Sequence, residues 1–102
     1  MASRIDLQTK LESILGSRNV YFQPPESVKM NYPAIVYSRD SIDTLYANDT
    51  RYKTTRRYQL ILIGKSPDNG TVDDLLSELP MCSYDRFYTA DNLNHDVFTL
   101  YW

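Results

Sequence analysis

Four consecutive apolar residues at positions 60–63 constrain the fold of this chain more than any other part of its sequence. They lie near the end of the segment RRYQLILIGK, residues 56–65. Successive side chains of a strand point to opposite faces, so a strand with this run is apolar on both faces. Such a strand belongs in the middle of a sheet, with material packed against both sides. The rest of the chain must therefore supply neighbouring strands and a covering layer.

Two segments have the periodicity of helices that can form this layer. Residues 4–15 carry apolar side chains at helical spacing, and Gly16 provides a left-handed stop. A second stripe follows Thr71, which is expected to cap the helix, and Pro80 lies just beyond its end. The two stripes are Leu7, Leu11, Ile14 and Leu15, and Val72, Leu75, Leu76 and Leu79. Each stripe predicts a helix that packs one side on the sheet.

Runs of β-branched and aromatic residues predict the other strands. These runs cover residues 19–22, 34–40, 82–89 and 96–102. The last two are predicted to pair antiparallel around the polar segment ADNLNH, residues 90–95. The order α-β-β-β-α-β-β then predicts one α+β domain over residues 1–102. Its sheet is expected to be mostly antiparallel, with about four or five strands packed by two helices.

The connection between the strands at 34–40 and 56–65 is long. Residues 41–54 read SIDTLYANDTRYKT, whereas hairpin loops usually have about two to five residues. We therefore expect a long hairpin or arm, partly outside the core, that carries Tyr46 and Tyr52. The sequence leaves open whether this arm is ordered alone or only on assembly.

Composition excludes several classes of protein. Hydrophobic residues make up 42% of the chain, which suits one modest core and is too high for a disordered chain. The single cysteine excludes an internal disulfide and a multi-cysteine zinc site. No apolar run approaches the roughly 18 residues of a membrane span, and no signal-peptide pattern is present. We expect a reducing cytoplasm and no membrane partner.

Charge is distributed unevenly, although the net charge is only −2. Residues 51–65 hold five basic side chains and no acidic one, whereas residues 66–102 hold seven acidic side chains and one basic one. The basic group consists of Arg51, Lys53, Arg56, Arg57 and Lys65. Opposite charges of this kind can pair within one molecule or between neighbouring copies.

The only histidine, His95, is flanked by Asp91 and Asp96, and the only cysteine, Cys82, lies upstream. A Cys–His pair with an orienting acid can act as a nucleophile and base, but this spacing does not force the residues together. The segment DNLNH is rich in residues that bond to the backbone in turns, and it lacks the spaced ligands of a zinc or calcium motif. We interpret His95 as a turn residue and predict no enzyme activity, cofactor or metal.

Two other features have more than one reading. The segment RYKTTRRY, residues 51–58, combines cations and aromatic rings, as phosphate-contacting and base-stacking surfaces do. The chain is acidic overall and has no nucleic-acid-binding motif, so a charged protein contact is the favoured interpretation. The terminal Trp102 suits core packing, which we favour, or a subunit contact.

Four stretches resemble a known family: NVYFQPPES, YPAIVYSRD, RRYQLILI and the C-terminal LPMCSYDRFYTADNLNHDVFTLY. The likeness covers nearly the whole chain, and the last of these stretches is its most specific part. They resemble the tail terminator, or tail completion, proteins encoded among the head–tail joining genes of long-tailed bacteriophages and prophages. The stretches are structural, so the resemblance transfers no catalytic residue. The predicted order of elements is similar to the α+β fold of lambda-type tail terminators.

The resemblance implies a structural role in the virion. Such proteins form a ring, commonly a hexamer, on the head-proximal end of the tail tube, where they stop tube polymerisation. The implied partners are copies of the chain itself, the tail tube protein, and a head connector or head-closure protein. Genome DNA only passes through the lumen. The implied location is the neck of the virus particle, and the host cytoplasm before assembly.

A ring requires two different patches of one subunit to meet. The basic middle and the acidic C-terminal third are a complementary pair, and the arm is long enough to reach a neighbour or the last ring of the tube. We therefore predict assembly contacts at Tyr46, Arg51, Tyr52, Arg56 and Arg57. Two alternatives stay open: another neck component, such as a head-closure adaptor, and a small nucleic-acid-binding module.

Overall fold

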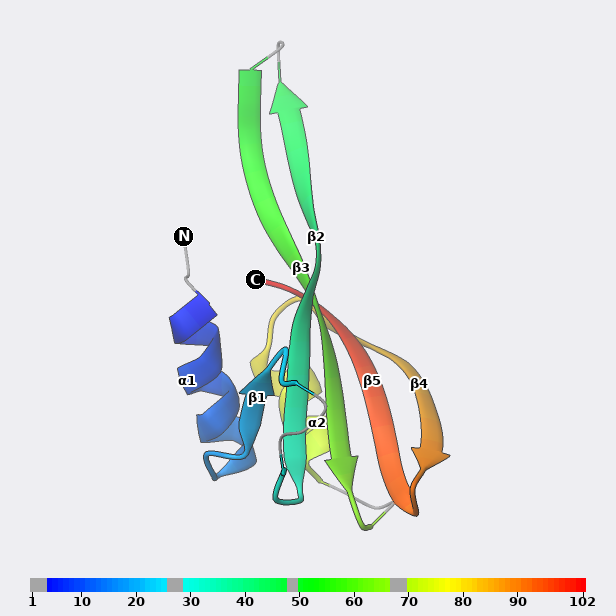
Figure 1. The fold of residues 1–102 in the computed structure, drawn as a ribbon. Helices are drawn as coiled ribbons and strands as arrows, with labels where there is room; N and C mark the ends of the chain where they lie inside the picture. Colours follow the sequence, from blue (N-terminus) through cyan, green and yellow to red (C-terminus); the bar gives the residue numbers. More distant parts are fainter. Residues whose placement is uncertain (1–3, 26–28, 48–49, 67–69) are drawn as a thin grey trace.

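The computed structural model describes residues 4–25, 29–47, 50–66 and 70–102, with residues 41–55 described by their backbone alone. The elements in chain order are α1 (Arg4–Leu15), β1 (Val20–Phe22), β2 (Ala34–Ala47), β3 (Thr50–Gly64), α2 (Thr71–Glu78), β4 (Cys82–Ala90) and β5 (Leu93–Tyr101) (Figure 1). The predicted α+β class and the order α-β-β-β-α-β-β are confirmed.

The sheet has five strands in the order β1-β2-β3-β5-β4. β1 pairs parallel with β2, and the other neighbours pair antiparallel. β3, which holds the apolar run 60–63, is the middle strand, as the sequence predicts. β4 is left at one edge of the sheet.

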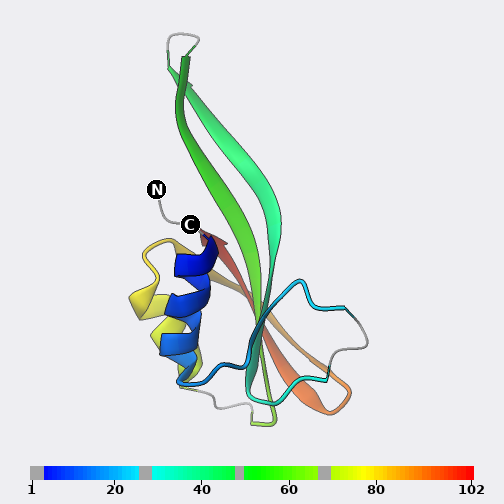
Figure 2. The same ribbon diagram turned by 60° about the vertical axis from the view of Figure 1, so that its left-hand side comes forward.

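The core lies between the two helices and one face of the sheet, called the helix-side face below. Figure 2 shows both helices on this side and the described part of the β1–β2 connection on the other side. Leu60 and Leu62 of β3 and Phe98 of β5 are almost fully buried here. They pack with Leu7 and Leu11 of α1, Leu75 and Leu79 of α2, Ile35 and Tyr37 of β2, and Leu100 of β5. Burial of each large side chain contributes about 1.5–3 kcal/mol.

Tyr37 fastens α1 to the sheet. Its ring is fully buried and lies 4.9 Å from the Phe22 ring, centroid to centroid. Its hydroxyl donates a hydrogen bond to Oε1 of Gln8 at 2.6 Å, and Nε2 of Gln8 donates to the Val20 carbonyl at 3.0 Å. Burial raises the pKa of Tyr37, so the hydroxyl remains a donor. These two partly buried hydrogen bonds thus join α1, β1 and β2.

The helix ends follow the sequence signals only in part. Gly16 has a φ of +80° and its N–H donates to the Glu12 carbonyl at 2.9 Å, as expected of a glycine that ends a helix. The predicted Thr71 cap is wrong, because α2 begins at Thr71 and its N-cap is Gly70, without a side-chain cap hydrogen bond. Leu76, predicted in the apolar stripe, is 38% exposed.

The C-terminal hairpin turns more tightly than the sequence suggests. Asp91 and Asn92 both have positive φ, and Ala90 is paired with Leu93. Two residues with left-handed backbone conformation form a two-residue turn whose twist matches that of the flanking strands. The ladder therefore continues through His95, and the interpretation of His95 as a turn residue is wrong.

The C-terminal residue is held by the body of the protein. Trp102 is partly buried and packs against the core. Its backbone N–H donates to the Arg56 carbonyl at 2.9 Å. The core interpretation of Trp102 is therefore confirmed.

Candidate assembly surfaces

β2 and β3 continue far beyond the strands that flank them. They pair with each other from Ala34↔Ile63 out to Ala47↔Thr50. β1 pairs with β2 only up to Tyr37, and the ladder between β3 and β5 ends at Arg57. Residues 41–47 and 50–56, called the arm below, therefore form a two-stranded ribbon that stands out from the body (Figure 1). The extended hairpin predicted at 41–54 is confirmed.

The arm leaves the body at a β-bulge. The register between β2 and β3 shifts between Arg39 and Ser41, which leaves Asp40 without an opposite residue. A bulge bends its strand and increases the local twist. Nε of Arg57 donates to Oδ2 of Asp40 at 2.8 Å. Tyr101, and then Asp40, raise the pKa of Arg57, so this cation stays charged at the root of the arm.

The residues predicted for assembly all belong to this ribbon or its root. Tyr46, Arg51 and Tyr52 lie on the arm by their backbone positions, and their side chains are outside the described residues. Arg56 is the last arm residue of β3, and its carbonyl accepts from Trp102. Arg57 already has an ion pair inside the chain. The structure thus groups the five positions but assigns Arg57 a role in holding the root.

The acidic C-terminal third does not form one continuous patch. Asp96 is only 7% exposed and accepts a hydrogen bond from the Tyr84 hydroxyl at 2.7 Å. Asp73 and Asp74 are exposed in the first turn of α2, and Glu78 lies 3.7 Å from Lys10. The exposed acidic side chains that can meet a basic partner are therefore divided among α2, Asp85 on β4 and Asp91 at the tip of the β4–β5 hairpin.

A second candidate surface is the free edge of β4, which the sequence did not single out. In the described part of the chain β4 pairs with β5 alone, and every residue of β4 after Cys82 is exposed. The most exposed large hydrophobic side chains among the described residues are Ile5, Leu76, Met81, Tyr84, Phe87 and Tyr88. All but Ile5 lie on α2, on β4 or between them. The central Asp85-Arg86 pair could have indicated an edge strand, because charged residues are common on such strands.

The Cys–His–acid arrangement is not formed. Cys82 pairs with Leu100, five positions along β5 from His95, which corresponds to about 17 Å. The odd spacing also places the two side chains on opposite faces of the sheet. Burial, and secondarily Asp85, raise the pKa of the Cys82 thiol to about 11, so it is protonated at neutral pH. His95 instead stacks on Tyr88, with centroids 4.6 Å apart and planes 15° apart.

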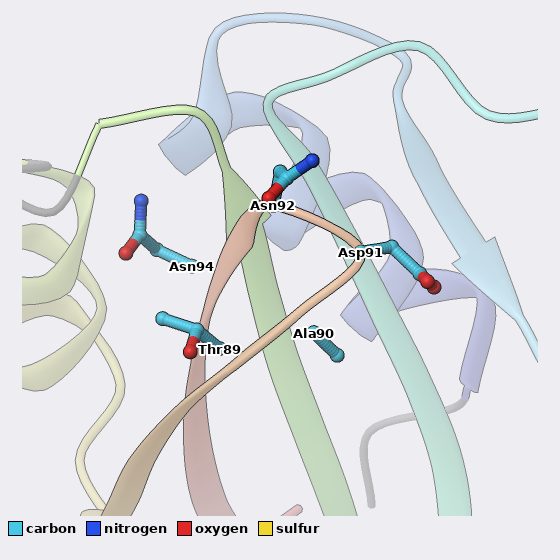
Figure 3. A pocket seen from close by; sticks show the side chains of 5 residues that line it. All are labelled: Thr89, Ala90, Asp91, Asn92 and Asn94. Atoms are coloured by element: carbon cyan, nitrogen blue, oxygen red, sulfur yellow. The ribbon is translucent and has the colours of Figure 1, made fainter.

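A hollow of about 470 Å³ lies at the tip of the β4–β5 hairpin. It is lined by Thr89, Ala90, Asp91, Asn92 and Asn94. Figure 3 shows that Asp91 points to the other side from Thr89 and Asn94, so these polar groups do not converge on one ligand position. No three histidine, cysteine or acidic side chains gather into a metal site within the described ranges. Among the same residues, no helix is both long and apolar enough to cross a membrane.

The sequence matches no protein-family model, and a search of curated proteins finds no relative. The likeness to tail terminator proteins therefore stays a prediction. The arm and the β4 edge are the two candidate assembly surfaces in the described residues.

Proposed function

We propose that this protein is a structural component of the neck of long-tailed bacteriophages, which forms a ring on the head-proximal end of the tail tube. In this role it ends tube polymerisation and offers the opposite side of the ring to a head connector or head-closure protein. The arm is the observation that carries the proposal. The proposed location in the virus particle rests on the resemblance of the sequence to tail terminator proteins.

The arm supports assembly because, beyond Arg56, the only strand neighbours described for its backbone are its own two strands. An isolated two-stranded ribbon is marginally stable in water and gains stability from a third strand or a covering layer. In the described chain, the partners of its strands end at Tyr37 on one side and near Arg57 on the other. A second protein molecule can supply the missing layer. When a different surface of the second molecule covers the arm, the contact joins two different patches, as a ring requires.

The experiment that tests this function is removal of the gene from a phage that encodes it, followed by electron microscopy. Over-long tails are expected, and antibody labelling should place the protein at the neck of intact particles. Tails of normal length with heads that lose DNA would instead indicate a head-closure adaptor. If the protein is absent from purified particles, the proposal is wrong. Tight, salt-sensitive binding to DNA would favour the nucleic-acid-binding alternative.

The charged residues at the arm root allow a sharper test in solution. Reversal of Arg56 and Arg57 to Glu should weaken ring formation with tail-tube subunits, measured by sedimentation. Arg57 also pairs with Asp40, so the double variant disturbs the root as well. Asp40→Asn removes that ion pair but keeps both cations, which makes it the matched control. Association of the double variant at wild-type affinity in physiological salt would exclude an electrostatic contact at these residues.

A further inference from the structure

The backbone groups that β4 presents to its free edge can be identified from two hydrogen bonds. The Tyr101 N–H donates to the Met81 carbonyl at 3.0 Å, next to β4, and the Trp102 N–H donates to the Arg56 carbonyl, next to β3. Antiparallel partners alternate between bonded and non-bonded pairs. Odd-numbered residues of β5 therefore bond to β4, and even-numbered ones bond to β3.

This alternation fixes the outward-facing positions of β4. Val97 and His95 are odd-numbered, so their partners Arg86 and Tyr88 use their backbone groups inside the sheet. Phe87 and Thr89 pair with even-numbered residues and direct their N–H and C=O groups away from β5. The outer edge of β4 thus offers regularly spaced donors and acceptors that a further strand can bind.

Side chains beside this edge are suited to a protein partner. Tyr84 is 41% exposed, Phe87 is 47% exposed, and Met81 just before the strand is 54% exposed. Phe87 pairs across the ladder with Asp96, and Tyr84 with Phe98, so both rings lie on the helix-side face. Aromatic residues and methionine are enriched in protein interfaces. Exposed apolar side chains gathered in this way mark an interaction surface.

The arm carries a matching unpaired edge. The Arg56 carbonyl accepts from Trp102, so even-numbered residues of β3 face away from β2. Thr54 is the next such position along the arm, past the point where the ladder with β5 ends at Arg57. The backbone groups of Thr54 thus face outward beyond the last described neighbour of β3. The same molecule therefore contains a free edge on its body and a free edge on its ribbon.

We propose that the β4 edge binds the arm of a second copy of this chain, with strand β3 of one copy continuing the sheet of the next. This inference rests on the ring-forming role proposed above and names the two surfaces that meet. Charge supports a second copy as the occupant. The β3 part of the arm carries Arg51, Lys53 and Arg56 and no acid, whereas α2, which contacts β4, exposes Asp73 and Asp74. The contact joins unlike patches and can therefore close into a ring.

Two pairs of threonine variants test the contact. Thr89→Pro and Thr54→Pro each remove one outward N–H without breaking a hydrogen bond inside the sheet. Thr89→Ala and Thr54→Ala keep the N–H and serve as matched controls. Sedimentation of the purified full chain should show self-association for the wild type and both alanine variants. Each proline variant should associate about tenfold or more weakly. Circular dichroism and thermal unfolding check that the body stays folded.

Mixing the two proline variants gives the decisive result. The Thr89→Pro copy keeps a functional arm and the Thr54→Pro copy keeps a functional edge. Together they should form a dimer that does not grow, although neither forms larger species alone. If Thr54→Pro associates normally while Thr89→Pro does not, two β4 edges pair with each other and the inference is wrong.

Two further outcomes would also overturn the inference. One is a wild type that stays monomeric at its highest soluble concentration; the other is a set of proline variants that associate like the wild type. If Thr89→Pro does not fold, Phe87→Lys tests the same edge through its side chain, because an exposed lysine opposes strand addition. Proline variants that associate like the wild type, together with normal placement of the protein at the neck of virus particles, would refute the edge contact alone. Absence from particles would refute the neck function alone.

Discussion

The body and the arm are made from the same two strands but differ in what surrounds them. In the body, β2 and β3 lie between other strands, and the helices cover one face. In the arm, the same strands have each other as their only described sheet neighbours. The body therefore contains the interactions that fold the chain, whereas the arm is the region that the proposed assembly contact would use. Changes in the two regions should separate stability from assembly.

The largest expected effect on stability comes from the buried core. Phe98→Ala empties a fully buried site on β5 and should lower the free energy of unfolding by about 3–5 kcal/mol. Phe87→Ala is a matched control, because this phenylalanine is 47% exposed on the neighbouring strand. The control should cost less than about 1 kcal/mol. Urea unfolding of both variants measures the difference, and equal losses would contradict the assigned core.

An intermediate effect is expected at the Tyr84–Asp96 hydrogen bond. Tyr84→Phe leaves the buried Asp96 carboxylate without this donor, and should cost about 1 kcal/mol at neutral pH because the tyrosine is partly exposed. The bond to Asp96, with burial second, raises the pKa of Tyr84 from 10.0 to about 12. Its contribution is therefore complete below pH 10 and disappears as the pH rises to about 12.

Urea unfolding at neutral pH and between pH 10 and 12 measures this contribution. Tyr84→Phe should lose less stability than the wild type over the alkaline interval. Tyr88→Phe makes the same chemical change on the same strand and should behave like the wild type. An identical alkaline loss in all three proteins would show that Tyr84 has no special contribution.

The smallest effect on stability, despite the largest change in sequence, is expected from shortening the arm. Asp43 and Thr55 are register partners, so residues 44–54 can be replaced by Asn-Gly, which suits a two-residue hairpin turn. The free energy of unfolding should change by less than about 1 kcal/mol, because loop length has a weak effect on closure entropy. Self-association should be lost. A large drop in the melting temperature of the monomer would show that the arm stabilises the body.

The sequence predicts the parts of this fold that are governed by periodicity and turn chemistry. The helix at 4–15 is predictable because its apolar residues recur at helical spacing. The central strand is predictable because the apolar run at 60–63 makes it apolar on both faces. The tight turn at Asp91 and Asn92 was missed because left-handed conformations at two non-glycine residues are uncommon. For this reason the sequence predicts His95 in a turn, whereas it lies in strand β5.

The candidate surfaces were only partly predictable. The arm followed from the length of the 41–54 segment. The free edge of β4 depends on the order in which strands pair, and β5 lies between β3 and β4 although it follows both in the sequence. Local patterns do not encode that order. The Arg57–Asp40 ion pair was missed for a similar reason, since it depends on the position of a bulge.

A single residue at that bulge controls how the ribbon is oriented. Arg39 is opposite Tyr58 and Ser41 is opposite Arg57, so removal of Asp40 would join these pairs into a continuous ladder. The faces of β2 would stay the same, but the local bend and extra twist of the bulge would be lost. The buried residues of the body lie on the other side of this point and would keep their positions. One deleted codon is thus enough to change the angle at which the arm leaves the body, which gives the lineage a short evolutionary route to new assembly geometry.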